Sequence, residues 1–294
     1  MDELRNQLFF PTTFQELFND WAHVPEAVPF AGGTQLLRLQ STQAPKIPQN
    51  ILSLHKLEEL HRITRNERYL EIGAMVKLND IIQLGKRLGK IVPEVFTRSL
   101  EGIGGPHIRN LATIGGNICN GSLRLDTAAP LIALDAHYEL RCSASGTRWI
   151  SASRFYGHPE PLSSAKPLPI GSQELLTRIR IPLDQWDYSL YKKFKHPPSG
   201  KGGGVMVFII RNQKNVLTDM RLVFAGDLVL RDRHTETQLI GKRLPLDWKE
   251  DTRSFVKQWE TYLSTLPPSL PPLDDFLRDS IINFVETSLL NLSD

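Results

Sequence analysis

Two short glycine-bearing segments carry the residue types best suited to hold a phosphate group. They are residues 30–34 (FAGGT) and 112–117 (ATIGGN), and in each, apolar residues lead into two adjacent glycines with a small polar side chain close by. Glycine lacks Cβ, so its N–H group can approach an anion closely, and successive N–H groups form a nest for phosphate oxygens. Thr34, Thr113 and Asn117 could add donors. Together the pairs would suit a pyrophosphate, whereas either pair alone is also typical of a tight turn.

The spacing of other glycines excludes two familiar phosphate motifs. The glycine–lysine pair at 200–201 lacks both the glycine five residues earlier and the following Ser or Thr that a P-loop requires. Gly102 and Gly104 do not continue to the third glycine of a dinucleotide fingerprint, because His107 stands in its place. The two glycine pairs therefore remain the candidates.

Two charged features lie within reach of these segments along the chain. Asp126 follows Asn117 by nine residues; its carboxylate could accept hydrogen bonds from ribose hydroxyls, or it could cap the helix that follows. Lys192, Lys193 and Lys195 form a basic cluster on an expected strand, and alternation puts Lys193 and Lys195 on one face. That face either meets a ligand or is solvated.

Composition excludes several classes of function. Cys119 and Cys142 are the only cysteines, so the chain cannot supply the four thiolates of an iron–sulfur cluster. No zinc motif occurs, and neither a metal ligand nor a catalytic side chain is nominated. The net charge is +3 with scattered basic residues, which does not indicate nucleic-acid binding. No apolar run is long enough for a membrane span, and residues 1–10 lack a signal-peptide core, so we expect a cytoplasmic protein.

The elements that must position these residues follow from periodicity and turn signals. The length of 294 residues fits two domains or three small subdomains. Apolar spacing predicts early helices over 13–21, 78–85, 92–100 and 126–134, and late helices over 253–263 and 273–290. A hairpin is expected at 62–74, and 157–171 is the expected linker. Strands are expected at 28–31, 51–54, 138–142, 175–181, 190–194, 205–210 and 220–225. This order favours an α+β fold over regular βαβ alternation.

The second glycine segment also resembles a known family. Residues 104–121 (GGPHIRNLATIGGNICNG) and 126–136 (DTAAPLIALDA) closely resemble a signature of FAD-binding subunits in the xanthine dehydrogenase and carbon monoxide dehydrogenase family of molybdenum hydroxylases. Residues 31–34 resemble that family's other flavin loop, and 221–244 resemble its C-terminal domain. The resemblance implies two α+β subdomains of the PCMH type (1–56 and 57–165), then a C-terminal domain (172–294) with a small antiparallel sheet and helices.

The resemblance implies FAD as cofactor and assigns the residues that contact it. They are Phe30, Ala31, Gly32, Gly33, Thr34, Gln35 and Leu36 of the first loop, Thr113, Ile114, Gly115, Gly116 and Asn117 of the second, and Asp126, with Ile103, Leu176 and Lys195 at further aligned positions. The chain departs from the family at Gln35, where Asp is usual. It departs again at 197–204, which is rich in glycine and proline.

The function implied is electron transfer within a larger enzyme. Electrons would pass from iron–sulfur clusters of a partner through FAD to NAD⁺ or another acceptor. Because this chain has neither the cysteines for those clusters nor a molybdenum site, we expect an iron–sulfur subunit and a molybdopterin-binding subunit as partners. A self-sufficient flavin oxidase and a flavin-free scaffold subunit are the alternatives.

Overall fold

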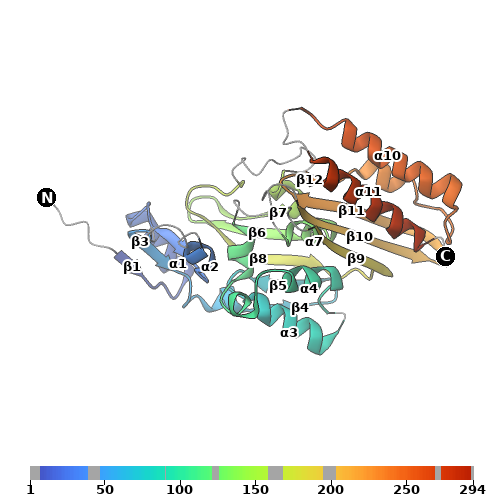
Figure 1. Cartoon of the computed structure of the whole chain (residues 1–294). Coiled ribbons are helices and arrows are strands. Elements are labelled where there is room, and N and C mark those ends of the chain that lie inside the picture. The colour runs from blue at the N-terminus through green and yellow to red at the C-terminus, as the bar shows by residue number, and fades with distance from the viewer. Residues whose placement is uncertain are drawn as a thin grey trace.

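The computed structural model describes residues 7–38, 47–89, 91–120, 126–157, 168–194, 203–268 and 273–292. Within these ranges the strands form three sheets, one in each of three consecutive parts of the chain (Figure 1). The first part stands at one end of the molecule and the last at the other, with the five-stranded sheet between them. The α+β class expected from the sequence is confirmed.

The first part is a small parallel sheet with a helix that the sequence predicts well. Its elements are β1 (Gln7–Phe9), α1 (Phe14–His23), β2 (Val28–Phe30), α2 (Thr34–Arg38) and β3 (Asn50–Ser53), with strand order β1-β3-β2. Thr13 caps α1 by accepting a hydrogen bond from the Glu16 amide at 3.1 Å. Leu17 and Trp21 turn into the core. The expected helix at 13–21 is thus confirmed, while α2 follows the first glycine pair without having been predicted.

The middle part is an antiparallel sheet of order β4-β5-β8-β6-β7. Its strands are β4 (Ile63–Arg65), β5 (Tyr69–Gly73), β6 (His137–Cys142), β7 (Gly146–Ser151) and β8 (Glu174–Pro182). Its helices are η1 (Glu58–His61), α3 (Leu78–Leu88), α4 (Glu94–Glu101), α5 (Pro106–Arg109), α6 (Ile114–Ile118), α7 (Ala128–Ala133) and α8 (Ala152–Phe155).

The expected hairpin is confirmed as β4–β5, and Asn66 fixes its turn by accepting from the Arg68 and Tyr69 amides at 2.8 and 2.7 Å. Because β8 pairs with β5 and β6, we propose that the C-terminal unit begins after Pro182 rather than at 172.

The last part is an antiparallel sheet covered on both faces. Its strands are β9 (Tyr188–Phe194), β10 (Gly204–Gln213), β11 (Val216–Gly226) and β12 (Val229–Leu230), followed by α9 (Arg233–Thr237), η2 (Trp248–Thr252), α10 (Arg253–Ser264) and α11 (Asp275–Leu290). Residues 204–210 of β10 are all buried, because α7 contacts one face of the sheet while α10 and α11 pack on the other. Ile209 and Ile210 accordingly belong to different hydrophobic cores.

The first core is shared by all three parts of the chain. It joins Leu17 of α1, Phe96 of α4, Ile179 of β8 and Ile209 of β10 in one cluster. The second core lies between the last sheet and its two long helices. No helix among the described ranges is long and apolar enough to cross a membrane.

Candidate functional site

The two glycine loops lie against each other. A Cβ added at Gly32 would stand 2.0 Å from the carbonyl oxygen of Leu111 and 3.2 Å from Cα of Ala112. A Cβ at Gly116 would lie 4.0 Å from that of Ala31. The backbones of the two loops are therefore in contact, and only glycine at position 32 permits that approach. The sequence prediction that both pairs face a shared site requires this proximity.

The first loop has amides available for a ligand. It links the end of β2 to the start of α2, and Gly33 adopts φ +67°, a left-handed conformation that glycine accepts at little cost. A Cβ at Gly33 would stand 2.7 Å from the Phe30 ring. No residue in the described ranges accepts a hydrogen bond from the amides of Gly32 or Gly33. A glycine turn that opens a helix is a common way to bind phosphate.

The second loop differs from the expected nest. The amides of Ile114 and Gly115 donate to Val76 and Ala74 at 3.0 and 2.9 Å. The amide of Gly116 donates to the Thr113 hydroxyl at 3.1 Å, which caps α6. Gly115 is needed for packing, since a Cβ there would stand 2.7 Å from that of Ala74. The two pairs are thus not equivalent: the amides of the first have no acceptor among the described residues, and the second brings α6 close to it.

Asp126 meets a lysine from the last sheet beside these loops. Lys193 Nζ donates to Asp126 Oδ2 at 2.9 Å and to the carbonyl of Gly102 at 2.8 Å. Burial raises the pKa of Asp126, and the ammonium of Lys193 opposes that rise. Thr127, not Asp126, is the N-cap of α7, so the capping interpretation of Asp126 is wrong. Thr127 also donates to the side-chain oxygen of Asn117 at 2.6 Å, which ties α7 to α6.

Tyr191 is a site residue that sequence reasoning missed. It lies two residues before Lys193 on β9, and a Cβ at Gly102 would stand 3.0 Å from its hydroxyl. That hydroxyl is buried and has no hydrogen-bond partner among the described residues. Burial and the nearby charge of Asp126 raise the pKa of Tyr191. Strand alternation from Lys193 was the signal that could have identified it.

The other predicted residues have different positions relative to the loops. Ile103 follows Gly102, and its carbonyl accepts from Arg109 at 3.0 Å. Leu176 is buried on β8, next to Thr177, whose carbonyl accepts from the Ala74 amide under α6. Gln35 and Leu36 are partly exposed on α2. Lys195 and residues 197–202 of the predicted loop lie outside the described residues.

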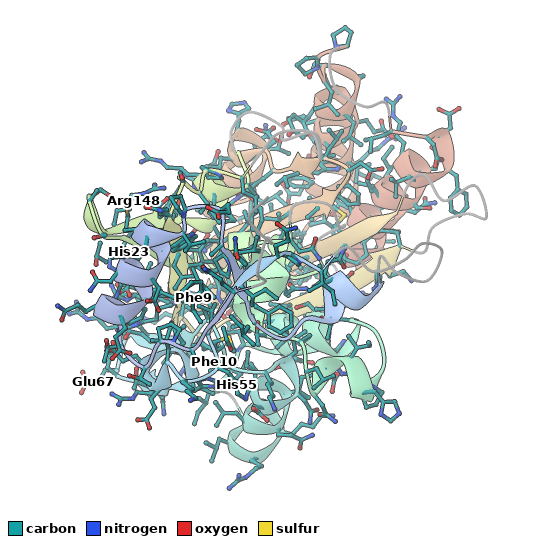
Figure 2. The ribbon with its side chains drawn as sticks, turned by 90° about the vertical axis from the view of Figure 1, so that its left-hand side faces the viewer. Phe9, Phe10, His23, His55, Glu67 and Arg148 are labelled. Carbon is teal, nitrogen blue, oxygen red and sulfur yellow. The ribbon has the colours of Figure 1, made fainter. Side chains whose placement is uncertain are left out.

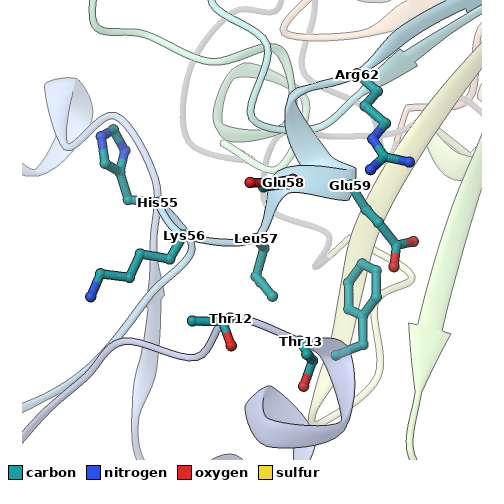
Figure 3. A pocket seen from close by; sticks show the side chains of 9 residues that line it. Thr12, Thr13, His55, Lys56, Leu57, Glu58, Glu59 and Arg62 are labelled. Atoms are coloured by element: carbon teal, nitrogen blue, oxygen red, sulfur yellow. The ribbon is translucent and has the colours of Figure 1, made fainter.

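A surface hollow of about 570 Å³ lies elsewhere, between α1 and the segment before β4 (Figure 3). Its lining mixes the cations Lys56 and Arg62 with the carboxylates Glu58 and Glu59, and includes no glycine-loop residue. Phe10 and His55, on the same side of the molecule, are labelled in Figure 2. We therefore assign the candidate site to the loops and not to this hollow.

The residues at the loops fit an FAD molecule. A dinucleotide needs amide donors for its diphosphate, acceptors for its ribose hydroxyls and apolar contact for its rings. The first loop has amides that no described residue uses, Asp126 has a carboxylate, and Ile103 and Leu176 are apolar. The unpartnered hydroxyl of Tyr191 adds a polar group that the described chain does not satisfy.

Comparison with known proteins agrees with this chemistry. The family described as "FAD binding domain in molybdopterin dehydrogenase" matches residues 4–184. The medium chain of glyceraldehyde dehydrogenase from Sulfolobus acidocaldarius is 29% identical over 230 residues, 78% of each chain. Xanthine dehydrogenase 2 from Arabidopsis thaliana is 28% identical over 253 residues, and the match covers 79% of this chain but 18% of that protein.

A solved structure shows the same fold over nearly the whole chain. Quinoline 2-oxidoreductase from Pseudomonas putida 86 superposes with a TM-score of 0.75 at 19% identity, covering 98% of this chain and 95% of that chain. The family match itself extends over more than half of the sequence. The chain therefore belongs to the family of FAD-binding domains of molybdopterin dehydrogenases, which confirms both the resemblance and the FAD cofactor that it implies.

Proposed function

We propose that the chain is the FAD-binding electron-transfer subunit of a molybdenum hydroxylase. The observation that carries this proposal is the contact between the two glycine loops at Gly32 and Leu111, beside amides that no described residue uses. FAD, when bound, supplies the redox chemistry by accepting electrons and passing them on. The chain's own task is to hold and orient that cofactor, and none of its side chains is needed as an acid or base.

We assign the residues of the site as follows. The amides of Gly32 and Gly33, with the Thr34 hydroxyl, would hold the diphosphate. Asp126 would accept hydrogen bonds from the cofactor, and Lys193 keeps its carboxylate oriented. Ile103 and Leu176 would give apolar contact. We thus assign Lys193 of β9 to the site, while Lys195, at which the resemblance implies a flavin contact, lies outside the described residues.

The partners follow from what the chain lacks. With Cys119 and Cys142 as its only cysteines it cannot hold an iron–sulfur cluster. We therefore infer an iron–sulfur subunit that delivers electrons and a molybdopterin-binding subunit where the substrate is oxidised. The name "medium chain" of the archaeal relative describes one chain among several in that enzyme. NAD⁺ is one candidate for the final acceptor.

The test is reconstitution of the purified chain with FAD. We expect one FAD per chain, with flavin absorbance bands and a raised melting temperature, because a ligand that binds only the folded state stabilises it. A chain that takes up no FAD at any concentration contradicts the proposal and favours a flavin-free scaffold. Turnover of a small substrate with oxygen by the FAD-loaded chain alone would instead favour a self-sufficient oxidase.

A further inference from the structure

Helix α7 connects the candidate flavin site to a cluster of charged side chains, two of which, Arg231 and Glu236, are buried. All six of its residues are buried, and it contacts both β10 and β11 of the last sheet. Asp126 stands just before its first turn and binds Lys193 of β9. Asp135 stands just after its last turn, at φ +50°. A helix of this length spans about 9 Å, so the two carboxylates mark the ends of one short rigid body.

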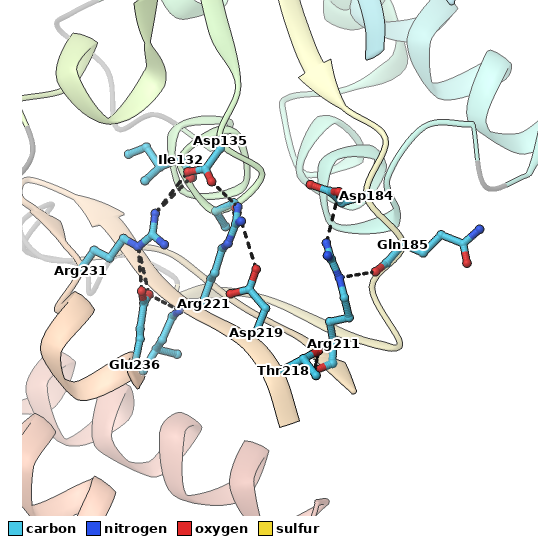
Figure 4. A network of polar contacts seen from close by, with 12 residues as sticks. Ile132, Asp135, Asp184, Gln185, Arg211, Thr218, Asp219, Arg221, Arg231 and Glu236 are labelled. Atoms are coloured by element: carbon cyan, nitrogen blue, oxygen red, sulfur yellow. Dashed lines mark hydrogen bonds and ion pairs between the residues drawn. The ribbon is translucent and has the colours of Figure 1, made fainter. Parts of the chain in front are cut away.

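Arg221 of β11 holds the C-terminal end of this helix (Figure 4). Its Nη1 donates to the carbonyl of Ala133 at 2.6 Å and pairs with Asp135 Oδ2 at 2.7 Å. Its Nη2 bonds Asp219 at 3.2 Å, and its guanidinium lies over the ring of Trp186 at 4.7 Å. The side chain is only 12% exposed. Arg221 is therefore fixed from several sides while it binds the end of α7.

Arg231 reaches the same helix end from beyond β12. Its Nη1 lies 3.6 Å from Asp135 Oδ1 and 3.5 Å from the carbonyl of Ile132. Its Nε bonds both oxygens of Glu236 at 3.0 and 3.1 Å, and Glu236 also accepts from the amide of Leu222 at 2.8 Å. Arg231 and Glu236 are each 5% exposed. Removing one partner of this buried pair leaves the other uncompensated, whereas Asp135 is 40% exposed and can be changed at a smaller cost.

We call Asp135, Arg221, Arg231 and Glu236 the α7 clamp. We propose that the α7 clamp is a positioning device for the cofactor: it fixes the orientation of α7 on the last sheet and thereby sets where Asp126 meets Lys193. This inference rests on the proposed function, in which the Asp126–Lys193 pair belongs to the FAD site.

The sheet geometry supplies the physical link. Lys193 and Arg221 sit in one sheet, since β9 pairs with β10 at Val205 and β10 pairs with β11 at Ile209. Asp126 and Asp135 flank one helix. The Asp126–Lys193 pair and the clamp attach the two ends of α7 to the sheet, and the buried residues between them pack on β10 and β11. Loss of the clamp should therefore alter the position of Asp126 at the other end of α7.

The variant Asp135→Asn tests this inference without disturbing the backbone. Asn tolerates a positive φ as well as Asp does, so the substitution removes the charge and leaves the turn. We expect FAD to bind the purified full chain about tenfold more weakly, the scale of coupling between residues in one polar network, with a shifted flavin midpoint potential. Arg221→Lys, which keeps a cation but loses the planar fork, should give a smaller loss and serves if Asp135→Asn does not fold.

A double-mutant cycle separates positioning from general stability. If the clamp acts through the Asp126–Lys193 pair, Asp135→Asn should have little further effect on FAD affinity in a Lys193→Gln background. Ile210→Ala, in the other core, is the control that lowers stability without weakening FAD binding. Additive losses, or unchanged affinity and potential in Asp135→Asn, contradict the inference alone. A wild-type chain that takes up no FAD contradicts the proposed function and the inference together.

Discussion

Gly32 brings the backbones of the two glycine loops into contact. A methyl group there would stand 2.0 Å from the Leu111 carbonyl oxygen, a backbone atom that cannot rotate away. We predict that Gly32→Ala separates the loops and lowers FAD affinity by at least tenfold, measured by titration of the apoprotein. Gly105→Ala is the matched control, because a Cβ at Gly105 meets nothing within 4 Å. Equal FAD affinities in the two variants would show that the loop contact does not govern binding.

The carboxylate of Asp126 should lower the stability of the folded apoprotein at neutral pH while it strengthens FAD binding. Burial raises its pKa in the folded chain, so the folded state binds a proton more readily than the unfolded state does. The resulting stabilisation is present at low pH and is lost as the pH rises through the folded pKa. At pH 7 the ionised carboxylate is therefore unfavourable, whereas an amide of the same shape is not.

We predict that Asp126→Asn weakens FAD binding but leaves the apoprotein at least as stable at pH 7. Lys193 loses its carboxylate partner in this variant, but it keeps the carbonyl of Gly102, and its side chain is 42% exposed, so water can solvate it. Thermal melts of both apoproteins between pH 4 and pH 8 check the claim, and the difference between them should shrink toward pH 4. A clear drop in melting temperature at pH 7 would mean that the ion pair stabilises the fold.

Among the elements, β5, β6 and β8 carry a ladder of alternating charges on one face. Glu71 on β5 pairs with Arg178 at 2.9 Å and Arg180 at 2.7 Å, both on β8. The Arg180 guanidinium also lies 4.1 Å from the Trp149 ring centroid on β7. Burial disfavours ionisation of Glu71, but hydrogen bonds from the two arginines outweigh it and lower its pKa. The ladder thus ties together strands that are distant in sequence.

We predict that Glu71→Gln costs roughly 1–2 kcal/mol of unfolding free energy at neutral pH. A lowered folded pKa gives stability that is present above the unfolded pKa and lost as the pH falls through the folded one. The difference between wild type and variant should therefore shrink as the pH falls. Urea melts at pH 7 and pH 3.5 measure it, with Glu94→Gln, which breaks the exposed Glu94–Arg98 pair, as control. A difference that is as large at pH 3.5 as at pH 7 would point to lost packing.

The sequence predicted the helices and strands whose own residues show a clear apolar pattern. Helix α1 has an apolar stripe and a capping threonine, and β10 has a long apolar run, so both were expected. Helix α6 has only five residues, and its amides find acceptors at Ala74 and Val76, far away in sequence. Helix α2 likewise has only five residues. Local propensity cannot indicate helices that tertiary contacts stabilise.

For the molecule as a whole, the resemblance located the loops but not what surrounds them. The glycine pairs and Asp126 could be assigned from the sequence because motif residues are local. The bond from Lys193 to Asp126 spans 67 residues, and that from Arg221 to Ala133 spans 88. Such contacts depend on how the last sheet packs on α7, which periodicity does not encode. The same packing divides the molecule into two cores that meet at β10.

Adjacent isoleucines on β10 allow the two cores to be tested separately. Ile209 packs into the core shared with the flavin subdomains, and Ile210 into the core under α10 and α11. Each side chain is at most 1% exposed, so Ile→Ala at either position should cost about 2–5 kcal/mol. Ile209 pairs with Arg221 of the α7 clamp, whereas Ile210 faces away from it. We therefore predict that Ile209→Ala weakens FAD binding and Ile210→Ala does not.

The measurement is FAD affinity at a temperature where both variants remain folded, with unfolding followed by urea melts. At matched stability, any difference in affinity reports on which core supports the site, because residue type, strand and burial are the same. Weaker binding in both variants would mean that the cores act as one cooperative unit. Unchanged binding in both would mean that the loops alone determine FAD affinity. Packing on the face of β10 that contacts α7 would then have no effect on the site.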